Sequence, residues 1–178
     1  IEEQFTLTSD GTYYFDLSAM GIPGTVNDAL PDKTMHYVPF TYAGTVDAYK
    51  LTSEKETTEE YAQQNKYPHS LFIANHNVTH TVSWNDLNTS DLIFGKDYAA
   101  GGVGYTLRAP SAGNHVEGTS PNRYIAPINN EWDTILQKSS GYIDNWRGVY
   151  SVCQDLFVSG SSAVYRGYNS IRHWVFTN

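Results

Sequence analysis

The side chains best suited to nucleophilic catalysis are few in this sequence. It contains one cysteine, Cys153, so no internal disulfide and no cysteine-based metal site can form. A nucleophilic cysteine needs a neighbouring base or cation to stabilise its thiolate, whereas the segment after Cys153 offers an acid, Asp155. We therefore expect Cys153 to be a buried, unreactive thiol in a strand. No Gly-x-Ser-x-Gly sequence favours any one serine, histidine and aspartate as a catalytic triad.

Metal ligands lack the spacing of a known metal site. His76 and His80 lie four residues apart in a segment that alternates as a strand does. On a strand, side chains at that spacing are separated by ~13 Å, too far to share one zinc ion. Oxygen ligands for calcium are present without the spacing of an EF-hand, and turn formation also explains them: Asp144, Asn145, Asp155, Asn85 and Asp86. We predict no cofactor, with calcium as the open alternative.

Aromatic and arginine side chains are concentrated toward the C-terminus, and they are the residue types found at binding hot spots. The set comprises Tyr142, Trp146, Tyr150, Tyr165, Tyr168 and Trp174, interleaved with Arg147, Arg166 and Arg172. Strand alternation would leave some of these rings exposed, where they can stack on sugars or anchor a protein partner. The predicted ligand-binding residues are Tyr150, Tyr168, Asn169, Arg172 and Trp174, with Asn114 and His115 from a long polar segment.

Short strands are the elements predicted to position these residues. The predicted strand segments are residues 4–17 as a hairpin around Ser9-Asp-Gly, 35–43, 45–51, 71–75 as a buried strand, 78–84, and several short strands after residue 141. Pro39 implies an edge strand or a bulge, and Asn85-Asp86 is expected to turn the chain.

One helix is well marked. Asn129 or Asn130 can cap its first turn, Glu131 lies near its start, and Gly141 can end it. Trp132, Ile135 and Leu136 would form its apolar face. Less certain helical segments are a short exposed helix or loop at 57–65 and a helical turn or loop at 90–94.

Two predicted loops have a composition or length that bears on function. Residues 99–104, Ala-Ala-Gly-Gly-Val-Gly, lack the spacing and flanking residues of a phosphate-binding loop, so we predict a flexible surface loop. The polar segment 108–124 is long enough for a functional or mobile loop.

Composition limits the class of protein. A chain of 178 residues suits one domain, and its 14 tyrosines with many Gly, Ser, Thr and Asn between short apolar runs favour a β-rich or α+β fold. The net charge of −8, without a basic cluster, argues against nucleic acid or an anionic membrane as partner. No apolar run approaches the ~20 residues needed to span a bilayer, so membrane insertion is not expected. Ile1 in place of Met predicts a piece of a longer chain, and the polar composition favours the cell surface or the extracellular space.

Three fragments recur in the order of a known family. Residues 81–86 (TVSWND), residues 107–110 (LRAP) taken with Glu131-Trp132, and residues 164–167 (VYRG) resemble segments of the formylglycine-generating-enzyme-like family. The resemblance spans about residues 70 to 176. It implies a C-type-lectin-like fold, which also serves as the binding head of intimin- and invasin-type bacterial adhesins and of retroelement variable proteins.

The departures from the family pattern bear on function. Ser111–Asn130 is inserted between the halves of one motif, and the family's enzymes depend on active-site cysteines, whereas Cys153 stands alone. The resemblance implies structural roles for Trp132, Trp146 and Arg166.

We therefore expect an α+β, C-type-lectin-like single domain, 1–178, of short twisted antiparallel strands with one or two short helices and long loops. Residues 66–178 would form the lectin-like core and 1–65 an N-terminal β-rich extension or the first strands of that fold. The predicted function is a non-enzymatic, adhesin-type module of a bacterial surface or secreted protein that recognises a host-cell protein or glycan. The alternatives are an oxidase of the formylglycine-generating type and a structural spacer of a large extracellular protein.

Overall fold

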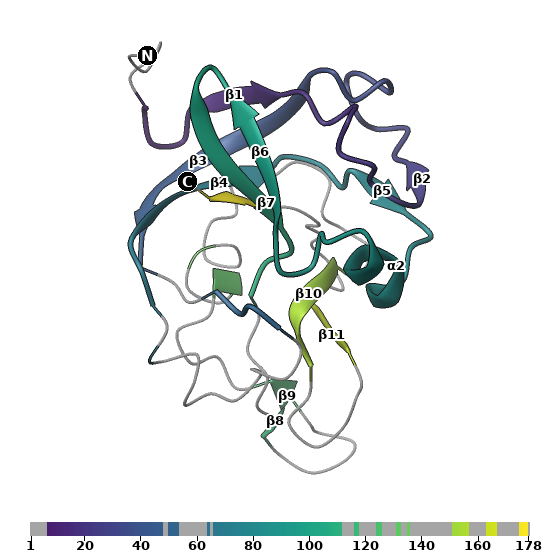
Figure 1. Ribbon diagram of the computed structural model, residues 1–178, viewed down its shortest axis with the longest axis vertical. Coiled ribbons are helices and arrows are strands. Elements are labelled where there is room, and N and C mark those ends of the chain that lie inside the picture. Colours follow the sequence, from purple (N-terminus) through teal and green to yellow (C-terminus); the bar gives the residue numbers. More distant parts are fainter. Residues whose placement is uncertain are drawn as a thin grey trace.

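The computed structural model describes residues 7–47, 50–53, 64, 66–111, 116–117, 124–125, 131–132, 135, 151–156, 163–166 and 175–177. Their main element is a six-stranded antiparallel sheet with the order β1-β3-β4-β12-β7-β6 (Figure 1). These strands are β1 (Thr12–Phe15), β3 (Val38–Val46), β4 (His69–Ala74), β6 (Lys96–Ala100), β7 (Val103–Arg108) and β12 (Val175–Thr177).

Smaller elements accompany this sheet. Three two-stranded antiparallel pairs are present: β2 (Thr25–Val26) with β5 (Thr79–His80), β8 (Val116–Glu117) with β9 (Tyr124–Ile125), and β10 (Ser151–Leu156) with β11 (Ala163–Arg166). The helix in the described part of the chain is α2 (Trp84–Thr89). The predicted short antiparallel strands are confirmed, but with one short helix in the described residues the fold is sheet-rich and has less helix than the α+β class predicted.

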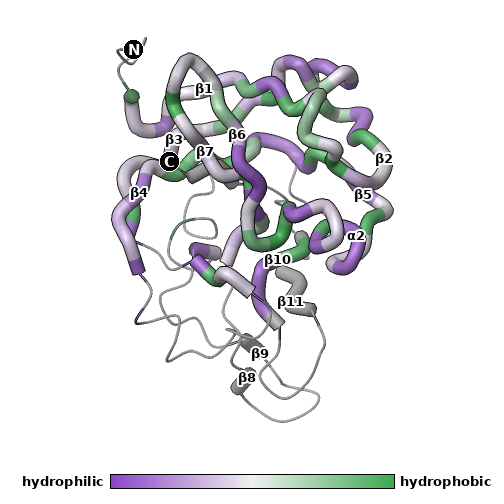
Figure 2. Tube along the Cα trace, in the orientation of Figure 1, coloured by the Kyte–Doolittle hydropathy of each residue, from purple (hydrophilic) through white to green (hydrophobic). Residues whose placement is uncertain are grey.

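One face of the large sheet carries an aromatic core. Phe15 lies 5.2 Å from Phe40 and 5.3 Å from both Phe72 and Tyr105, measured between ring centroids, and all three pairs meet edge to face. Such pairs contribute about 0.5–1.5 kcal/mol each beyond their buried area. The segment between α2 and β6 is visibly apolar and adds Leu92 and Ile93 to this core (Figure 2).

The other face of β4 is covered as well. Leu71 and Ile73 alternate with Phe72 and are fully buried, so this central strand is apolar on both sides. That explains why residues 71–75 read as a continuous apolar run, and the predicted buried strand is confirmed. Cys153, fully buried in β10, likewise agrees with its prediction.

The helix α2 was not predicted, because the strand expected at 78–84 and the turn at Asn85-Asp86 were wrong. Only Thr79–His80 of that segment is strand, and Ser83 caps a helix with a capping box. The Ser83 hydroxyl accepts from the Asp86 backbone N–H, while the Asp86 carboxylate accepts from the Ser83 backbone N–H. Ser90 ends this helix and does not start another.

Two further sequence predictions were wrong about the environment of a segment. Pro39 does not mark an edge strand, because β3 lies between β1 and β4, and the register shift in β3 that corresponds to the predicted bulge lies between Tyr42 and Thr45, not at Pro39. Proline is tolerated as the second residue of the strand, before pairing with β4 begins at Phe40. Residues 99–104 are not a flexible loop but the tip of the β6–β7 hairpin. Gly101 and Gly102 have φ angles of 58° and 82°, as a two-residue type I′ turn requires.

The described residues do not form the hairpin predicted at 4–17, because the structure pairs β1 with β3 and residues 7–10 are not strand. Most of the predicted helical segments 57–65 and 129–141 lie outside the described residues. In the described part of the chain, no helix has the length and apolar character needed to cross a membrane.

Candidate functional site

A fully buried ion pair joins the end of β7 to a distant segment. Arg108 Nη1 donates to Glu131 Oε1 at 2.5 Å and Arg108 Nη2 donates to Glu131 Oε2 at 2.7 Å, with neither side chain accessible to solvent. This two-bond arrangement matches the planar guanidinium to the carboxylate. Arg108 and Glu131 belong to the two halves of the interrupted motif, so the structure brings these halves together.

Backbone contacts of Ser111 hold Glu131 in place. The Ser111 backbone N–H donates to Glu131 Oε1 at 3.2 Å, and Ser111 Oγ accepts from the Glu131 backbone N–H at 3.0 Å. The Trp132 backbone N–H donates to the Ser111 carbonyl, and the Trp132 side chain is buried. Burial alone would raise the pKa of Glu131, but the charge of the Arg108 guanidinium, together with the neighbouring His69 and the hydrogen bonds that Arg108 donates, lowers it to about 2.

His69 connects this ion pair to Tyr67. Its Nδ1 lies 2.9 Å from the Tyr67 carbonyl, so Nδ1 carries the proton in the neutral ring. The other nitrogen, Nε2, lies 3.4 Å from Arg108 Nη2 and 3.9 Å from Glu131 Oε2. The Tyr67 and His69 rings stack at 4.5 Å between centroids with a 31° tilt. The buried cluster therefore fixes the position of a partly exposed tyrosine.

Tyr67 lines a cleft of about 640 Å³ at the β6–β7 hairpin. The residues around this cleft are Lys50, Tyr67, Asp97, Tyr98, Ala99, Gly104, Tyr105 and Thr106. Its volume falls in the range of about 300–1,000 Å³ typical of small-ligand pockets. We call it the hairpin cleft.

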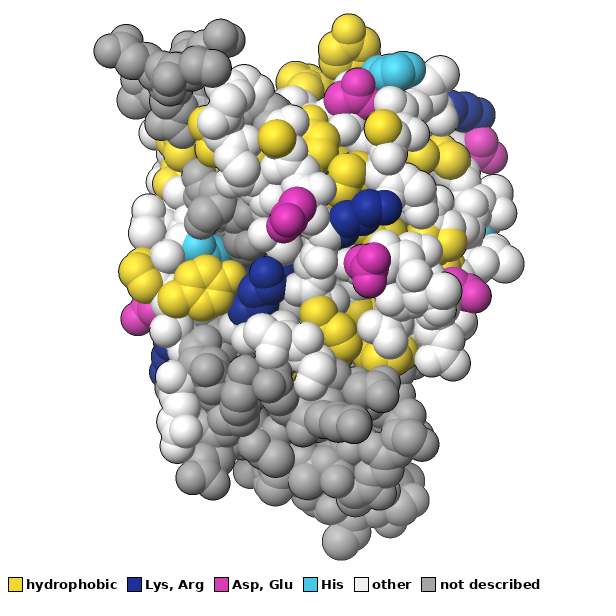
Figure 3. Space-filling view, in the orientation of Figure 1, with side chains coloured by type: hydrophobic (Ala, Val, Ile, Leu, Met, Phe, Trp, Pro, Cys, Tyr) yellow, Lys and Arg dark blue, Asp and Glu magenta, His cyan; other side chains and the backbone are white. Residues whose placement is uncertain are grey.

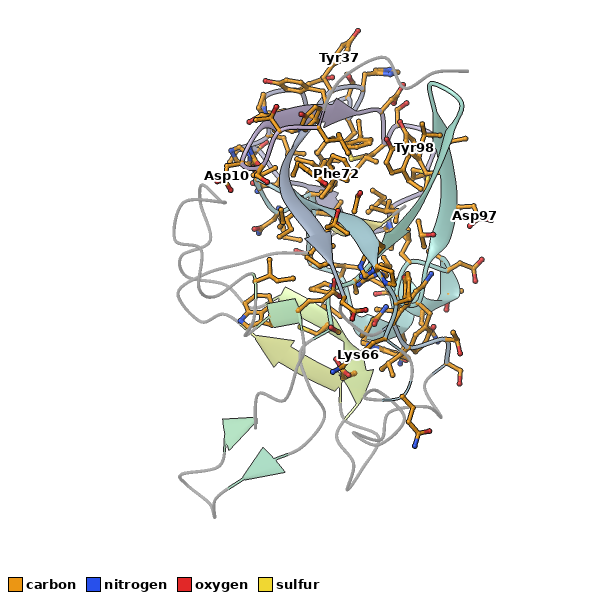
Figure 4. The ribbon with its side chains drawn as sticks, turned by 90° about the vertical axis from the view of Figure 1, so that its left-hand side faces the viewer. Asp10, Tyr37, Lys66, Phe72, Asp97 and Tyr98 are labelled. Atoms are coloured by element: carbon orange, nitrogen blue, oxygen red, sulfur yellow. The ribbon has the colours of Figure 1, made fainter. Side chains whose placement is uncertain are left out.

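Strand register decides which side chains of the hairpin face this cleft. Asp97 pairs with Thr106 and Ala99 pairs with Gly104, so these four residues share one face, and Tyr98 with Tyr105 shares the other. Figure 4 shows Asp97 pointing outward and Tyr98 pointing into the body of the molecule. Tyr98 packs on Phe15 in the aromatic core, and its burial raises the pKa of its phenol. This face of the hairpin is therefore flat at the Ala99–Gly104 pair, and the neighbouring Asp97–Thr106 pair adds a carboxylate and a hydroxyl.

Gly104 has no side chain and leaves this face of the hairpin open. It is an exposed strand residue, and a Cβ added to it would meet no atom within 4 Å. Glycine inside a strand weakens it and often marks a place where a ligand or another backbone approaches closely.

Lys50 supplies a cation at the hairpin cleft. Its side chain is half-buried, and a Cβ at Gly95 would lie 3.1 Å from its Nζ, which places the ammonium against the backbone just before β6. Lys50 makes no hydrogen bond with any residue that the structure describes. Burial and the nearby Arg108 lower the pKa of Lys50, while Asp97 and Glu131 oppose that shift.

The described part of the face seen in Figure 3 shows no gathering of one charge, because acidic, basic and hydrophobic side chains are interspersed there. The large hydrophobic side chains that are well exposed among the described residues are Tyr14 and Tyr37, at 63% and 67%, and Figure 4 shows Tyr37 projecting from the end opposite β8 and β9.

The predicted ligand-binding residues all lie outside the described residues: Asn114, His115, Tyr150, Tyr168, Asn169, Arg172 and Trp174. The calcium candidates do not converge in the described part of the chain, where no three acidic, histidine or cysteine residues group as metal ligands. Asp86 is engaged by Ser83 in the α2 cap, Asp155 is buried in β10, and Asp144 with Asn145 is not described.

Sequence reasoning missed the hairpin cleft itself. Its residues come from four separate segments, and no local motif links Lys50 or Tyr67 to the hairpin. The one signal present was the alternation of Asp97, Ala99, Gly104 and Thr106 about a Gly-Gly turn, which predicts a hairpin with a polar, small-residue face.

Comparison with known proteins gives no relative: no family model matches this chain, and no curated protein or solved structure shows significant similarity to it.

Proposed function

We propose that this chain is a non-enzymatic, adhesin-type ligand-binding module of a bacterial surface or secreted protein, and that the hairpin cleft binds a glycan of the host cell. The observation that supports this most directly is the open cleft beside an ammonium without a hydrogen-bond partner among the described residues.

The chemistry of the cleft suits a sugar. Tyr67 offers an aromatic ring held by His69, and the flat Ala99–Gly104 pair leaves room for a saccharide ring to lie on the hairpin. Thr106, Asp97 and Lys50 supply hydrogen-bonding groups around it. Small-ligand sites commonly combine an apolar or aromatic surface with a few polar groups of this kind.

Two of the motif fragments support a C-type-lectin-like fold, because each has a definite structural role here. Residues 81–86 contain the Ser83–Asp86 capping box that starts α2, and Arg108 pairs with Glu131 across the insertion.

The test is a variant that fills the cleft. Gly104→Val adds a side chain in open space at a strand position, so we expect the free energy of unfolding to stay equal or to rise by about 0.5–1 kcal/mol. Binding of the full chain to a glycan array and to host cells should nevertheless fall at least tenfold. The matched control is Thr12→Val on the exposed edge of the sheet, which should leave binding unchanged. Equal binding by Gly104→Val and wild type would exclude the hairpin cleft as the glycan site.

Catalysis is tested separately with Cys153→Ser. Because Cys153 does not line the hairpin cleft, we expect folded Cys153→Ser to keep its glycan and cell binding, even if the buried hydroxyl lowers the free energy of unfolding. An oxidase activity of the wild-type chain that disappears in Cys153→Ser would favour the enzyme alternative. A wild-type chain that binds neither glycans nor cells would favour a spacer module.

A further inference from the structure

The ammonium of Lys50 is the group in the hairpin cleft that most needs a ligand. A lysine carries three N–H donors, and Lys50 places its donors half-buried without a hydrogen bond to any described residue. Its Nζ lies against the backbone at Gly95, at the edge of the hairpin face that carries Asp97 and Thr106. A buried or half-buried ammonium is stabilised by an anion that accepts these hydrogen bonds.

The carboxylates that the structure describes near Lys50 do not fill this role. Glu131 directs its two oxygens to Arg108 and to the Ser111 backbone N–H. Asp97 forms no ion pair with Lys50 within 4 Å, since the ion pairs of the described residues are Lys33–Asp28, His36–Asp16, His69–Glu131 and Arg108–Glu131. Among the described residues, therefore, the ammonium of Lys50 is left for an anion that a ligand can supply.

Other charges limit how much negative charge this ligand can carry. Asp97 is exposed on the same face of the hairpin, at the rim of the cleft. The chain as a whole has a net charge of −8, which repels polyanions. A ligand with one carboxylate near Lys50 and hydroxyl groups toward Asp97 and Thr106 fits these charges, and a sulfated chain with many charges does not.

We propose that the hairpin cleft selects acidic sugars, with Lys50 binding the single carboxylate of a saccharide ring that lies over Ala99 and Gly104 beside Tyr67. This inference rests on the proposed function, because it names the class of glycan bound at that site.

The experiment compares matched sugars that differ only in the carboxylate. The probes are the methyl glycoside of galacturonic acid against that of galactose, and sialyllactose against its carboxyl-reduced form, titrated into the full 178-residue chain by calorimetry or by NMR. We expect the acidic member of at least one pair to bind about tenfold or more tightly, as one charge-assisted hydrogen bond would provide. A highly sulfated oligosaccharide should bind more weakly than the preferred acidic sugar.

Lysine variants assign this preference to a side chain. Lys50→Met should remove the preference for the acidic sugar and change binding of the neutral sugar less than about twofold, whereas Lys50→Arg should retain part of it. Lys33→Met is the control, because it removes the same charge from an exposed lysine outside the cleft. Circular dichroism of each variant checks that the fold is intact.

The possible failures are distinguishable. Equal binding of acidic and neutral sugars, with both lost in Gly104→Val, would overturn the acidic-sugar inference and leave the proposed function standing. An acidic preference that Lys33→Met reduces as much as Lys50→Met would also overturn it, because the effect would be one of overall charge. Absence of binding to all of these sugars, with cell binding unaffected by Gly104→Val, would overturn both.

Discussion

At the scale of single residues, the Arg108–Glu131 pair decides the stability of the cluster beneath the cleft. Both charges are fully buried, and removing one leaves the other without a partner. We expect Glu131→Gln to lower the free energy of unfolding at neutral pH by about 3–5 kcal/mol, measured by urea denaturation. Asp28→Asn, which removes half of an exposed ion pair, should change it by less than about 1 kcal/mol. A Glu131→Gln variant as stable as wild type would contradict a structural role for the pair.

Acid should weaken the same pair. The pKa of Glu131 in the folded chain, about 2, lies below its ordinary value of 4.5, so its contribution to stability is fully present above pH 4.5 and is lost as the pH falls toward 2. Asp16 also has a pKa lowered to about 2 by its hydrogen bonds to Ser18 and His36. The change in the free energy of unfolding of the wild-type chain with pH therefore reports several carboxylates. The double variant Arg108→Met/Glu131→Leu, which removes both charges of the pair together, should show a shallower loss of stability between pH 4.5 and 2 than wild type. An unchanged slope would show that Glu131 does not contribute to acid unfolding.

At the scale of elements, the start of α2 rests on its capping box. Ser83→Ala removes the hydroxyl that accepts from the Asp86 backbone N–H, and we expect a loss of about 1 kcal/mol and a fall in Tm of about 2–4 °C. Thr89→Ala in the last turn of α2, whose hydroxyl bonds only the Asn85 carbonyl within the helix, should cost less than about 0.5 kcal/mol. Equal losses in the two variants would mean that the capping box adds nothing specific.

A comparison of β4 with α2 shows what a sequence pattern can and cannot predict. β4 was predictable because a strand covered on both faces must be apolar throughout. The signal for α2 was also in the sequence, as Ser83 followed three residues later by Asp86, but the alternation of Val78 to Trp84 outweighed it in the prediction. The buried Trp84 and Leu87 lie three residues apart on the helix, which is the spacing that alternation concealed.

At the scale of the whole molecule, long-range pairing explains why the site could not be predicted. The contact between Arg108 and Glu131 was not predicted, since nothing local links these two residues. The hairpin cleft depends on the register that places Asp97 opposite Thr106 and on the path of the chain that brings Lys50 to Gly95. Register and chain path are set by the packing of the complete sheet, so neither is encoded in any single segment.

The position of β12 gives the sharpest prediction at this scale. Although it lies near the C-terminus, it pairs with β4 on one side and with β7 on the other, so it joins β1-β3-β4 to β7-β6 in one sheet (Figure 1). Proline at its centre removes a backbone N–H at a residue that is paired on both sides, unlike Pro39, which lies before the pairing of β3 with β4 begins. We therefore expect Phe176→Pro to prevent folding, seen as loss of cooperative unfolding by circular dichroism and as aggregation in size-exclusion chromatography. Phe176→Leu, which keeps the N–H, should still fold. If Phe176→Pro unfolded with the same cooperative transition as wild type, β12 could not lie in the interior of the sheet. The attachment of the β6–β7 hairpin to the rest of the sheet through β12 would then also be wrong.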